Sequence, residues 1–478
     1  MTCVPTGRLR LPAAPAQAQT DGVRKVGTVR IQRLSGGDLM QWQADVGPVP
    51  QNIAGLLHVG VSDTTATALV GSIAERLEGM PLLSRRPAPA GFGCGSPVWL
   101  ADTGGAAAHV FREPLADVGA GAVLARAGTL LIRHLPADRA PWSVHVLCSD
   151  ADVPVAVLVM LHHVLADGGT AVALVAALAA PKGAPVPPSV PQLPEVLPRR
   201  WVLAKDAWAA RLHAVRRAPS LIRTLRPALH ELGGQRMPLA ARSVLNRRTG
   251  PNRRIALVTV PEPALRAAAR VYGGSLNDTV LVVIADVLAD VVAQHDEAID
   301  PVVVSVPVAR RVRVGGAERP GNAVGVMPTP VPTRGTLPER VASVAAWRHE
   351  RLAGSSAGAS LPIVLVSFRV LHALGLVGWF TDRQRLVTTF ATSVAGPTEP
   401  IALAGIPVTA ITPLVLSQGN TTVAFASLSY AGTLSLSVSA DPDVGPDADA
   451  VADLLRARLT EAVDGGCPST SAGSAPGG

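Results

Sequence analysis

The sequence predicts an α/β protein of two domains. Three observations lead to this: a length of 478 residues, an apolar content of 48% with only 16% charged residues, and two successive cycles of short apolar runs and helix-like stretches. A chain of this length exceeds what one hydrophobic core usually supports, so two cores are expected. The same composition excludes an intrinsically disordered chain, which would carry fewer apolar residues and more charge.

Changes in composition along the chain predict the domain boundaries. Residues 1–27 are rich in Pro, Ala and Gln and are expected to form a disordered leader, and residues 464–478 a flexible tail. Between them we expect an N-terminal domain over residues 28–180 and a C-terminal domain over residues 254–463. Residues 181–253, which are first Pro-rich and then basic, would form the linker.

Each half of the chain alternates apolar runs with stretches of helical length. Residues 153–161 (VPVAVLVML) are typical of a buried strand because they are short and rich in β-branched side chains, and residues 170–180 then indicate a helix. Further strands are expected at residues 255–260, 302–307, 386–393, 421–429 and 432–439. Further helices are expected at residues 263–271, 277–292, 338–352 and 447–463.

No apolar run free of charge reaches the roughly 18 residues that a membrane-spanning helix needs. The nearest candidate, residues 361–380, carries Arg369 and His372 near its middle. An Arg at a helix centre costs about 2.5–3.5 kcal/mol on insertion. We therefore expect a core helix here, with a position against a membrane surface as the alternative.

The net charge of +8 is concentrated between residues 199 and 254, where only Asp206 and Glu231 oppose many arginines. Such a segment attracts phosphates on a cofactor, an anionic lipid or a nucleic acid, with a solvated helical face as the plain alternative. No helix-turn-helix, zinc-finger or RNP pattern is present, so no nucleic-acid partner is expected. Residues 201–215 are expected to be helical.

The cysteines indicate a reducing compartment. Cys3, Cys94, Cys148 and Cys467 are isolated and have neither the spacing of metal ligands nor that of a redox pair. We therefore expect a cytoplasmic protein without a bound metal ion.

The most specific feature is the stretch HHVLADG at residues 162–168, where the predicted strand ends. Adjacent strand residues face opposite sides of a sheet, so His162 and His163 cannot share one role. One imidazole should face a cleft and accept a proton near neutral pH, while the other packs inward. Asp167 and Gly168 would fix the exit from the strand, with Asp167 accepting from backbone N–H groups or pairing with an arginine.

This HHxxxDG pattern resembles the hallmark of the wax ester synthase/diacylglycerol acyltransferase family, which belongs to the CoA-dependent acyltransferase superfamily. Other stretches resemble the signatures of that family in the same order, from about residue 29 to residue 463. They are RLS at 33–35, LPADRAPW at 135–142, LNRRTGPNRR at 245–254, GSLND at 274–278, VPV at 306–308, GN at 321–322, VAGP at 394–397, LAG at 403–405 and SYAG at 429–432.

The resemblance implies a fold and a reaction. The fold would be two chloramphenicol-acetyltransferase-like domains with a cleft or tunnel between them. His163 would be the general base, taking the proton from an alcohol whose oxygen attacks the thioester of a long-chain acyl-CoA. No acyl-enzyme would form, and no GxSxG stretch or motif cysteine offers a covalent nucleophile. His162 and Asp167 would complete the catalytic motif.

The resemblance also implies supporting residues and partners. Gly168 would support the motif, and Asn277 would be a polar group facing the cleft, with a helix N-cap at Asn277 and Asp278 as the alternative. Acyl-CoA would be a co-substrate rather than a bound cofactor. The acceptor would be diacylglycerol, giving triacylglycerol, or a fatty alcohol, giving a wax ester. We expect a peripheral position on the inner membrane face or on lipid droplets.

The chain departs from the family pattern at three places. Ser393 stands where the family has Asn, Ala309 where it has Ser, and Ala140-Pro141-Trp142 replaces PLW. These changes leave the predicted base in place and leave the choice of acceptor open. Two alternatives therefore stay open: a CoA- or carrier-protein-dependent acyltransferase with a different hydroxyl acceptor, and a non-catalytic relative that binds lipid.

Overall fold

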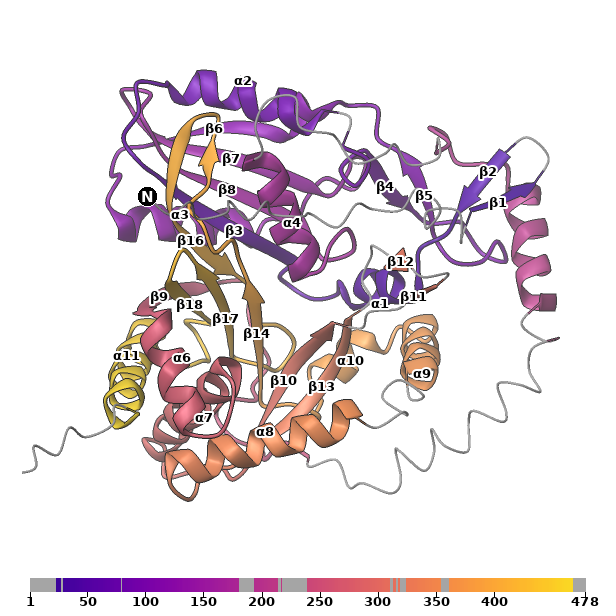
Figure 1. Ribbon diagram of the computed structural model, residues 1–478. Helices are drawn as coiled ribbons and strands as arrows, with labels where there is room; N and C mark the ends of the chain where they lie inside the picture. The colour runs from indigo at the N-terminus through magenta and orange to yellow at the C-terminus, as the bar shows by residue number, and fades with distance from the viewer. Residues whose placement is uncertain are drawn as a thin grey trace, which may run out of the picture.

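Two six-stranded sheets with helices packed on them form the body of the protein (Figure 1). The computed structural model describes residues 23–26, 29–78, 80–179, 193–213, 216, 239–309, 313–314, 317–318, 324–353 and 361–466. The N-terminal sheet contains, in spatial order, β15 (Ala402–Leu403), β16 (Ile406–Leu414), β3 (Asn52–Val59), β8 (Pro154–His162), β7 (Trp142–Ser149) and β6 (Val110–Leu115). The C-terminal sheet contains β13 (Val324–Val331), β10 (Val302–Ala309), β14 (Thr389–Ala395), β17 (Val423–Tyr430), β18 (Thr433–Ala440) and β9 (Arg254–Pro261).

The helices pack against these sheets, and short strand pairs lie beside them. The helices are α1 (Gly36–Ala44), α2 (Ala66–Leu77), α3 (Ala120–Leu131), α4 (Gly168–Ala179), α6 (Glu262–Val271), α7 (Leu276–Ala293), α8 (Leu337–Ala353), α9 (Leu361–Ala373), α10 (Val377–Thr381) and α11 (Ala448–Gly465), with a 3-10 turn at Ala106–His109. The strand pairs are β1 (Val23–Val26) with β2 (Val29–Gln32), β4 (Arg85–Ala88) with β5 (Val98–Ala101), and β11 (Arg313–Val314) with β12 (Ala317–Glu318). The predicted two-domain α/β class is confirmed.

Strand β8 is buried on both faces of the N-terminal sheet. Val157 and Leu161 pack in the core that also contains α2 and α4, whereas Leu158 and Met160 pack in the core that contains α3. Side chains alternate between the faces of a strand, so each face needs its own apolar set. This explains the unbroken apolar run of the predicted strand, and it makes the histidine pair the end of a fully buried element.

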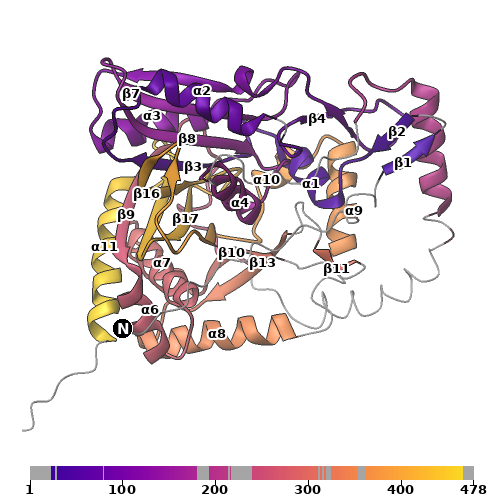
Figure 2. The same cartoon turned by 45° about the horizontal axis from the view of Figure 1, so that its top comes forward.

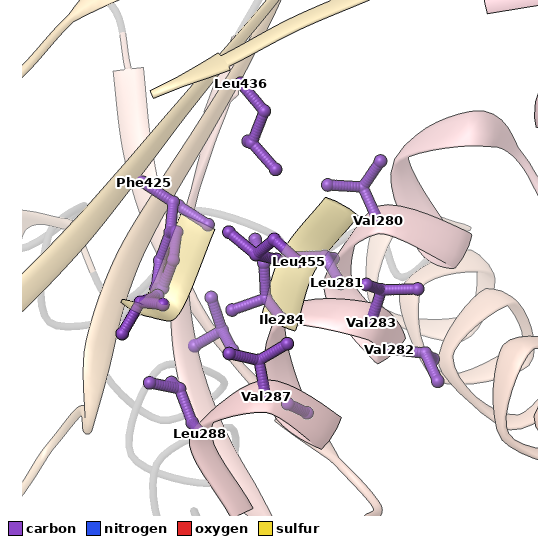
Figure 3. Close-up of a cluster of buried hydrophobic side chains, with 14 of the residues drawn as sticks. Val280, Leu281, Val282, Val283, Ile284, Val287, Leu288, Phe425, Leu436 and Leu455 are labelled. Atoms are coloured by element: carbon purple, nitrogen blue, oxygen red, sulfur yellow. The ribbon is translucent and has the colours of Figure 1, made fainter. Parts of the chain in front are cut away.

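Figure 3 shows the core of the C-terminal sheet, where α7 meets the strands. Ile284 and Leu288 of α7, Leu455 of α11, Phe425 of β17 and Leu436 of β18 belong to one cluster, and each is at most 1% exposed. Burying a side chain of this size contributes about 1.5–3 kcal/mol. The long apolar helix predicted at residues 277–292 is therefore confirmed as the central core helix of this half.

Two strands of the second half, β15 and β16, belong to the first sheet. Strand β16 pairs antiparallel with β3, and its register places Ile411 opposite Leu57 and Leu414 opposite Ala54. The predicted domain boundaries were therefore wrong for residues 402–414, which complete the N-terminal sheet. The reason is that strand pairing is set by long-range contacts, which the local pattern of β16 does not reveal. Because β16 comes from the C-terminal half and pairs with β3, it links the two sheets.

The predicted helix at residues 361–380 is broken into α9 and α10. Gly375 lies between them with a φ of +68°, a conformation that glycine adopts without strain. Beyond residue 365 the apolar side chains of this region are largely exposed, including Val370 at 52%, Leu374 at 65% and Trp379 at 56%. The expectation of a core helix was wrong. None of the helices in the described part of the chain combines the length and hydropathy needed to cross a bilayer.

Most of the predicted leader and tail and about half of the predicted linker fall outside the described residues. Strand β1 pairs with β2, so the expectation of disorder was wrong for residues 23–26. Within the linker, residues 200–213 are helical, which confirms the helix expected from residue 201 as far as residue 213. We refer to residues 200–213 as the linker helix.

A glycine after β14 leads to a test of how tightly the C-terminal sheet is packed. A methyl group added at Gly396 would lie 2.4 Å from the carbonyl oxygen of Ser429 and 2.9 Å from Leu428. We expect Gly396→Ala to lower the free energy of unfolding by about 1–3 kcal/mol, since the backbone has to move. Gly71, in the middle of α2, has no atom within 4 Å of the added group. Gly71→Ala should therefore be neutral or stabilising by up to about 1 kcal/mol in the same urea titration. Equal effects at the two sites would contradict this packing.

Candidate active site

The backbone of the histidine pair is held from both neighbouring strands. The N–H of His162 donates to the carbonyl of Pro141, just before β7, at 2.9 Å. The N–H of His163 donates to the carbonyl of Gln51, just before β3, at 2.8 Å. The N–H of Leu165 then closes the turn onto the carbonyl of His162 at 2.9 Å. The two imidazoles therefore start from a rigid strand end.

His162 is the inward-packed histidine, with only 5% of its surface exposed. Its Nδ1 accepts the N–H of Val164 at 3.0 Å, and a ring nitrogen that accepts carries no proton. In the neutral ring the proton is therefore on Nε2, which lies 3.1 Å from Oδ2 of Asp45. Nδ1 therefore braces the turn, and Nε2 faces the Asp45 carboxylate. The expected division of roles between the histidines is supported for His162.

Asp45 is a member of the site that the sequence analysis missed. Its Oδ1 accepts the N–H of Gln51 at 3.0 Å, and the carbonyl of Gln51 holds the backbone of His163. Burial raises the pKa of the Asp45 carboxyl, but the contacts with His162, with the N–H of Gln51 and with the nearby His134 together outweigh burial, so the pKa is lowered overall. Asp45 thus contacts His162 directly and reaches His163 through Gln51.

His163 is half-buried. It follows the last residue of β8, and α4 begins five residues later. Arg85 is a second residue that the sequence analysis missed. Its Nη2 lies 3.5 Å from the carbonyl oxygen of Leu165, inside the motif, and its guanidinium stacks over Trp99 at 4.3 Å. Burial lowers the pKa of Arg85, although the charge of Asp38 opposes this.

Asp167 caps helix α4. Its Oδ1 accepts both the N–H and the hydroxyl of Thr170 at 2.8 Å, the geometry of an N-cap residue. Of the two expected roles, acceptor for backbone N–H groups or partner of an arginine, the structure supports the first. Gly168 follows at the point where α4 approaches the C-terminal sheet. A methyl group there would lie 2.9 Å from Val394 of β14, so the motif lies where the two sheets meet.

Asn277 and Asp278 lie at the start of α7, whereas the HHxxxDG turn lies between β8 and α4. The N-cap is Ser275, and Asp278 completes the capping box by accepting the backbone N–H of Ser275 at 2.9 Å. Asp278 also forms an ion pair with Arg348 of α8. The expected N-cap pair was therefore wrong for Asn277, because the N-cap is Ser275, whereas Asp278 does take part in the cap as the second residue of the capping box. Asn277 is half-buried.

Two of the three departures from the family pattern lie close to the motif. Pro141 supplies the carbonyl that holds His162, and Trp142 donates from Nε1 to the carbonyl of Leu83 at 2.8 Å. Ser393 is exposed on β14, directly before the Val394 side chain that Gly168 approaches. Ala309 is the last residue of β10.

Two of the family-like stretches outside the motif have structural explanations. Ser35 caps α1 in a capping box with Asp38. Arg253 donates to the carbonyls of Ser417 and Gly250 and lies 3.3 Å from Asp441 in a fully buried pair. Burial lowers the pKa of Arg253 to about 10, although Asp441 raises it. Ser35 therefore has a structural role as a helix cap, and Arg253 has a structural role in holding loops.

A second histidine network lies on the α3 side of the N-terminal sheet. Nε2 of His145 lies 3.0 Å from the hydroxyl of Ser143, and Nδ1 lies 3.1 Å from Glu113, which also pairs with Arg126. This order resembles a serine, base and acid arrangement. Ser143 is only 3% exposed, however, so a substrate does not reach its hydroxyl. We assign this network to the support of β6 and β7. In the described part of the chain, no group of three or more His, Cys, Asp or Glu is arranged to hold a metal ion.

Comparison with protein families identifies the chain. Residues 34–280 match the wax ester synthase/diacylglycerol acyltransferase catalytic domain, and residues 320–462 match the WS/DGAT C-terminal domain. The first match alone spans more than half of the chain. The chain belongs to the wax ester synthase/diacylglycerol acyltransferase family. It is therefore an acyltransferase, and the resemblance described from the sequence is confirmed.

Relatives and solved structures agree with this family. A probable diacylglycerol O-acyltransferase of Mycobacterium tuberculosis (strain ATCC 25618 / H37Rv) is 27% identical over 403 residues, covering 80% of this chain and 85% of the relative. The wax ester synthase/diacylglycerol acyltransferase of Marinobacter aquaeolei VT8 has a TM-score of 0.63 at 19% identity, over 91% of this chain and 100% of that chain. The first condensation domain of the calcium-dependent antibiotic synthetase has a TM-score of 0.57 at 16% identity, and the match covers 93% of this chain and 98% of that chain. These structures show the fold, which is a pair of chloramphenicol-acetyltransferase-like domains.

The N-cap role of Asp167 can be separated from a role of its charge. Asn caps helices about as well as Asp, so Asp167→Asn should keep both the stability and the turnover of the wild type. Asp167→Ala removes the cap and should lower the free energy of unfolding by about 1 kcal/mol, with a loss of turnover as the motif loosens. Urea unfolding and CoA release measure the two effects. Loss of turnover in a stable Asp167→Asn variant would show instead that the carboxylate charge is needed.

The contact of Asp45 with His162 predicts a pH-dependent stability. Asp45→Asn should lower the free energy of unfolding by about 1–2 kcal/mol at neutral pH. Because the pKa of Asp45 is lowered in the folded state, its contribution is complete above the unfolded pKa of about 4 and is lost as the pH falls through the folded pKa. The difference between the wild type and the variant should therefore shrink on acidification below about pH 4. A difference that grows there in urea titrations would contradict the assignment.

Proposed function

We propose that this acyltransferase moves a long-chain acyl group from acyl-CoA to the hydroxyl of a lipid alcohol, with His163 as the general base. The observation that carries this proposal is the engagement of His162. Its Nδ1 accepts the N–H of Val164 and its Nε2 lies 3.1 Å from Asp45, so the proton-accepting role falls to His163. The half-buried position of His163 supports the same assignment.

In the proposed step, the alcohol oxygen attacks the thioester carbonyl while its proton passes to the ring of His163. The new carbon–oxygen bond forms, the carbon–sulfur bond breaks, and the proton then neutralises the departing CoA thiolate. Such a base contributes about 10²–10⁴-fold, and positioning and oxyanion stabilisation supply the rest. A cysteine nucleophile is disfavoured in the described part of the chain. Cys94 and Cys148 are buried, and burial raises the pKa of the Cys148 thiol.

The acceptor we propose is diacylglycerol or a fatty alcohol. The name of the tuberculosis relative supports diacylglycerol, and the name of the matched family supports both. An acyl chain would need an aliphatic tunnel at the junction of the two sheets, where Gly168 approaches Val394. A different hydroxyl acceptor, or a carrier-protein thioester as donor, is the second candidate. Ser393, next to Val394, is the departure that favours it.

We further propose that the enzyme acts as a peripheral protein, on the inner face of the membrane or on lipid droplets, where such acceptors dissolve. The exposed apolar side chains of the α9–α10 region support this, with Leu374 at 65% and Trp379 at 56% exposed. Arg383 lies over the ring of Trp379 at 5.6 Å, so a cation accompanies the apolar surface.

Substitution of each histidine tests the proposed base. His163→Ala should lower acyl transfer by at least about 10²-fold while the protein stays folded, because the proton acceptor is lost. His162→Ala should retain more turnover but lose about 1–3 kcal/mol of stability, because the backbone N–H of Val164 and the carboxylate of Asp45 lose their partner. CoA release and urea unfolding measure the two. Wild-type turnover by the folded His163→Ala variant would rule out His163 as the base.

An acceptor screen with purified protein and palmitoyl-CoA separates the candidate reactions. Diacylglycerol, fatty alcohols and glycolipids are compared by CoA release and by the ester formed. We expect an ester of diacylglycerol or of a fatty alcohol. CoA release only with another hydroxyl compound would favour the second candidate.

A further inference from the structure

The linker helix has an inner face that fixes it to the N-terminal half. Val202 and Leu203 are buried in a cluster with Ile31, Val98 and Leu100 of the neighbouring strands. This cluster is separate from the cores of the two sheets. The linker helix is therefore a packed element and not a loosely attached segment.

Arg33 anchors the same inner face. Its Nε donates to Oδ2 of Asp206 at 2.7 Å, its Nη2 donates to the carbonyl of Leu203 at 3.0 Å, and its Nη1 donates to the carbonyl of Ser96 at 2.6 Å. The Asp206 side chain is 2% exposed. Asp206, the acidic residue of the linker helix, thus faces inward and is neutralised. These contacts fix the rotation of the helix about its own axis.

The opposite, outer face of the linker helix carries large apolar side chains that are exposed to solvent. Trp201 is 63% exposed, Trp208 66% and Leu212 55%. Together with Lys205, which is also exposed, they recur at the spacing of one helical stripe. The linker helix already packs on the protein through its buried apolar face. Exposed tryptophans on the opposite face add no stability by burial in the core. This second stripe therefore indicates a partner.

The exposed Lys and Arg side chains of residues 199–213 surround this stripe. Arg199, Arg200, Lys205 and Arg211 are exposed, and the guanidinium of Arg211 lies over the ring of Trp208 at 5.2 Å. With Asp206 turned inward, no acidic side chain of residues 199–213 lies on the outer surface. Tryptophan beside Lys and Arg on one face is the pattern of a helix that lies in a membrane interface.

We propose that the outer face of the linker helix docks on a bilayer surface that carries anionic phospholipids. Trp201, Trp208 and Leu212 would enter the headgroup region, and the surrounding cations would meet the lipid phosphates. Figures 1 and 2 place the linker helix and α9 at the same end of the molecule, opposite α11. The inference deepens the proposed function, because it names the surface from which a lipid acceptor would be taken.

Vesicle co-sedimentation of the full-length protein tests this docking. Vesicles of phosphatidylcholine alone are compared with vesicles that also contain phosphatidylglycerol. The variant Trp201→Ser/Trp208→Ser should bind the anionic vesicles at least about tenfold more weakly than wild type. The affinity of the variant Lys205→Gln/Arg211→Gln for the anionic vesicles should fall roughly fivefold for each charge removed, and less at high salt.

Val61→Ser, at a fully exposed site after β3, is the apolar control, and Arg456→Gln on α11 is the charge control. Both controls should bind as wild type does.

Turnover is measured in parallel, so that a failure of the docking proposal can be distinguished from a failure of the proposed acyl transfer. The tryptophan variant should keep its turnover with an acceptor dispersed in detergent and lose it with the same acceptor embedded in anionic vesicles. Wild-type vesicle binding by this variant, or equal binding of wild type to neutral and anionic vesicles, would overturn the proposal. A raised KM for acyl-CoA in Lys205→Gln/Arg211→Gln, with unchanged vesicle binding, would assign the charges to CoA phosphates and would also overturn it. Vesicle binding is read without catalysis, so an inactive enzyme would refute the reaction and not the docking.

Discussion

The arrangement of the site depends on one side chain, the imidazole of His162. The strand that ends there is buried on both faces, and a polar ring in such a place is tolerated only when its nitrogens have partners. The N–H of Val164 and the carboxylate of Asp45 supply them from opposite sides. This brace sets the direction of the turn, and the turn sets where His163 and the cap of α4 lie.

The second requirement is that the two halves of the chain stay in contact at this turn. Strand β16 leaves the C-terminal half and pairs with β3, whose first residue, Asn52, lies opposite His162 in the register of β8. Gly168 then allows α4 to approach Val394 of β14. The motif is thus held between the two sheets, where a site made from both halves of the chain can form. Separating the halves would take away one side of it.

The features that were predictable from sequence are those encoded locally. The strand at 153–161 and the cap at Asp167 depend on neighbours a few residues away, so composition and spacing are enough to find them. Asp45 could not be found in this way, because its contact with His162 joins distant parts of the chain. The exchange of β16 was missed for the same reason. The exposure of α9 was missed because an apolar run looks the same in a core and on an interfacial surface.

The central claim is that the acyl group passes directly from the thioester to the alcohol, without being held by a side chain. The most direct test is the intact mass of the protein after incubation with palmitoyl-CoA in the absence of an acceptor. Direct transfer predicts an unchanged mass, since His163 only accepts a proton from the alcohol and no alcohol is present. A protein that gains the mass of one acyl group, and loses it when the alcohol is added, would contradict the account.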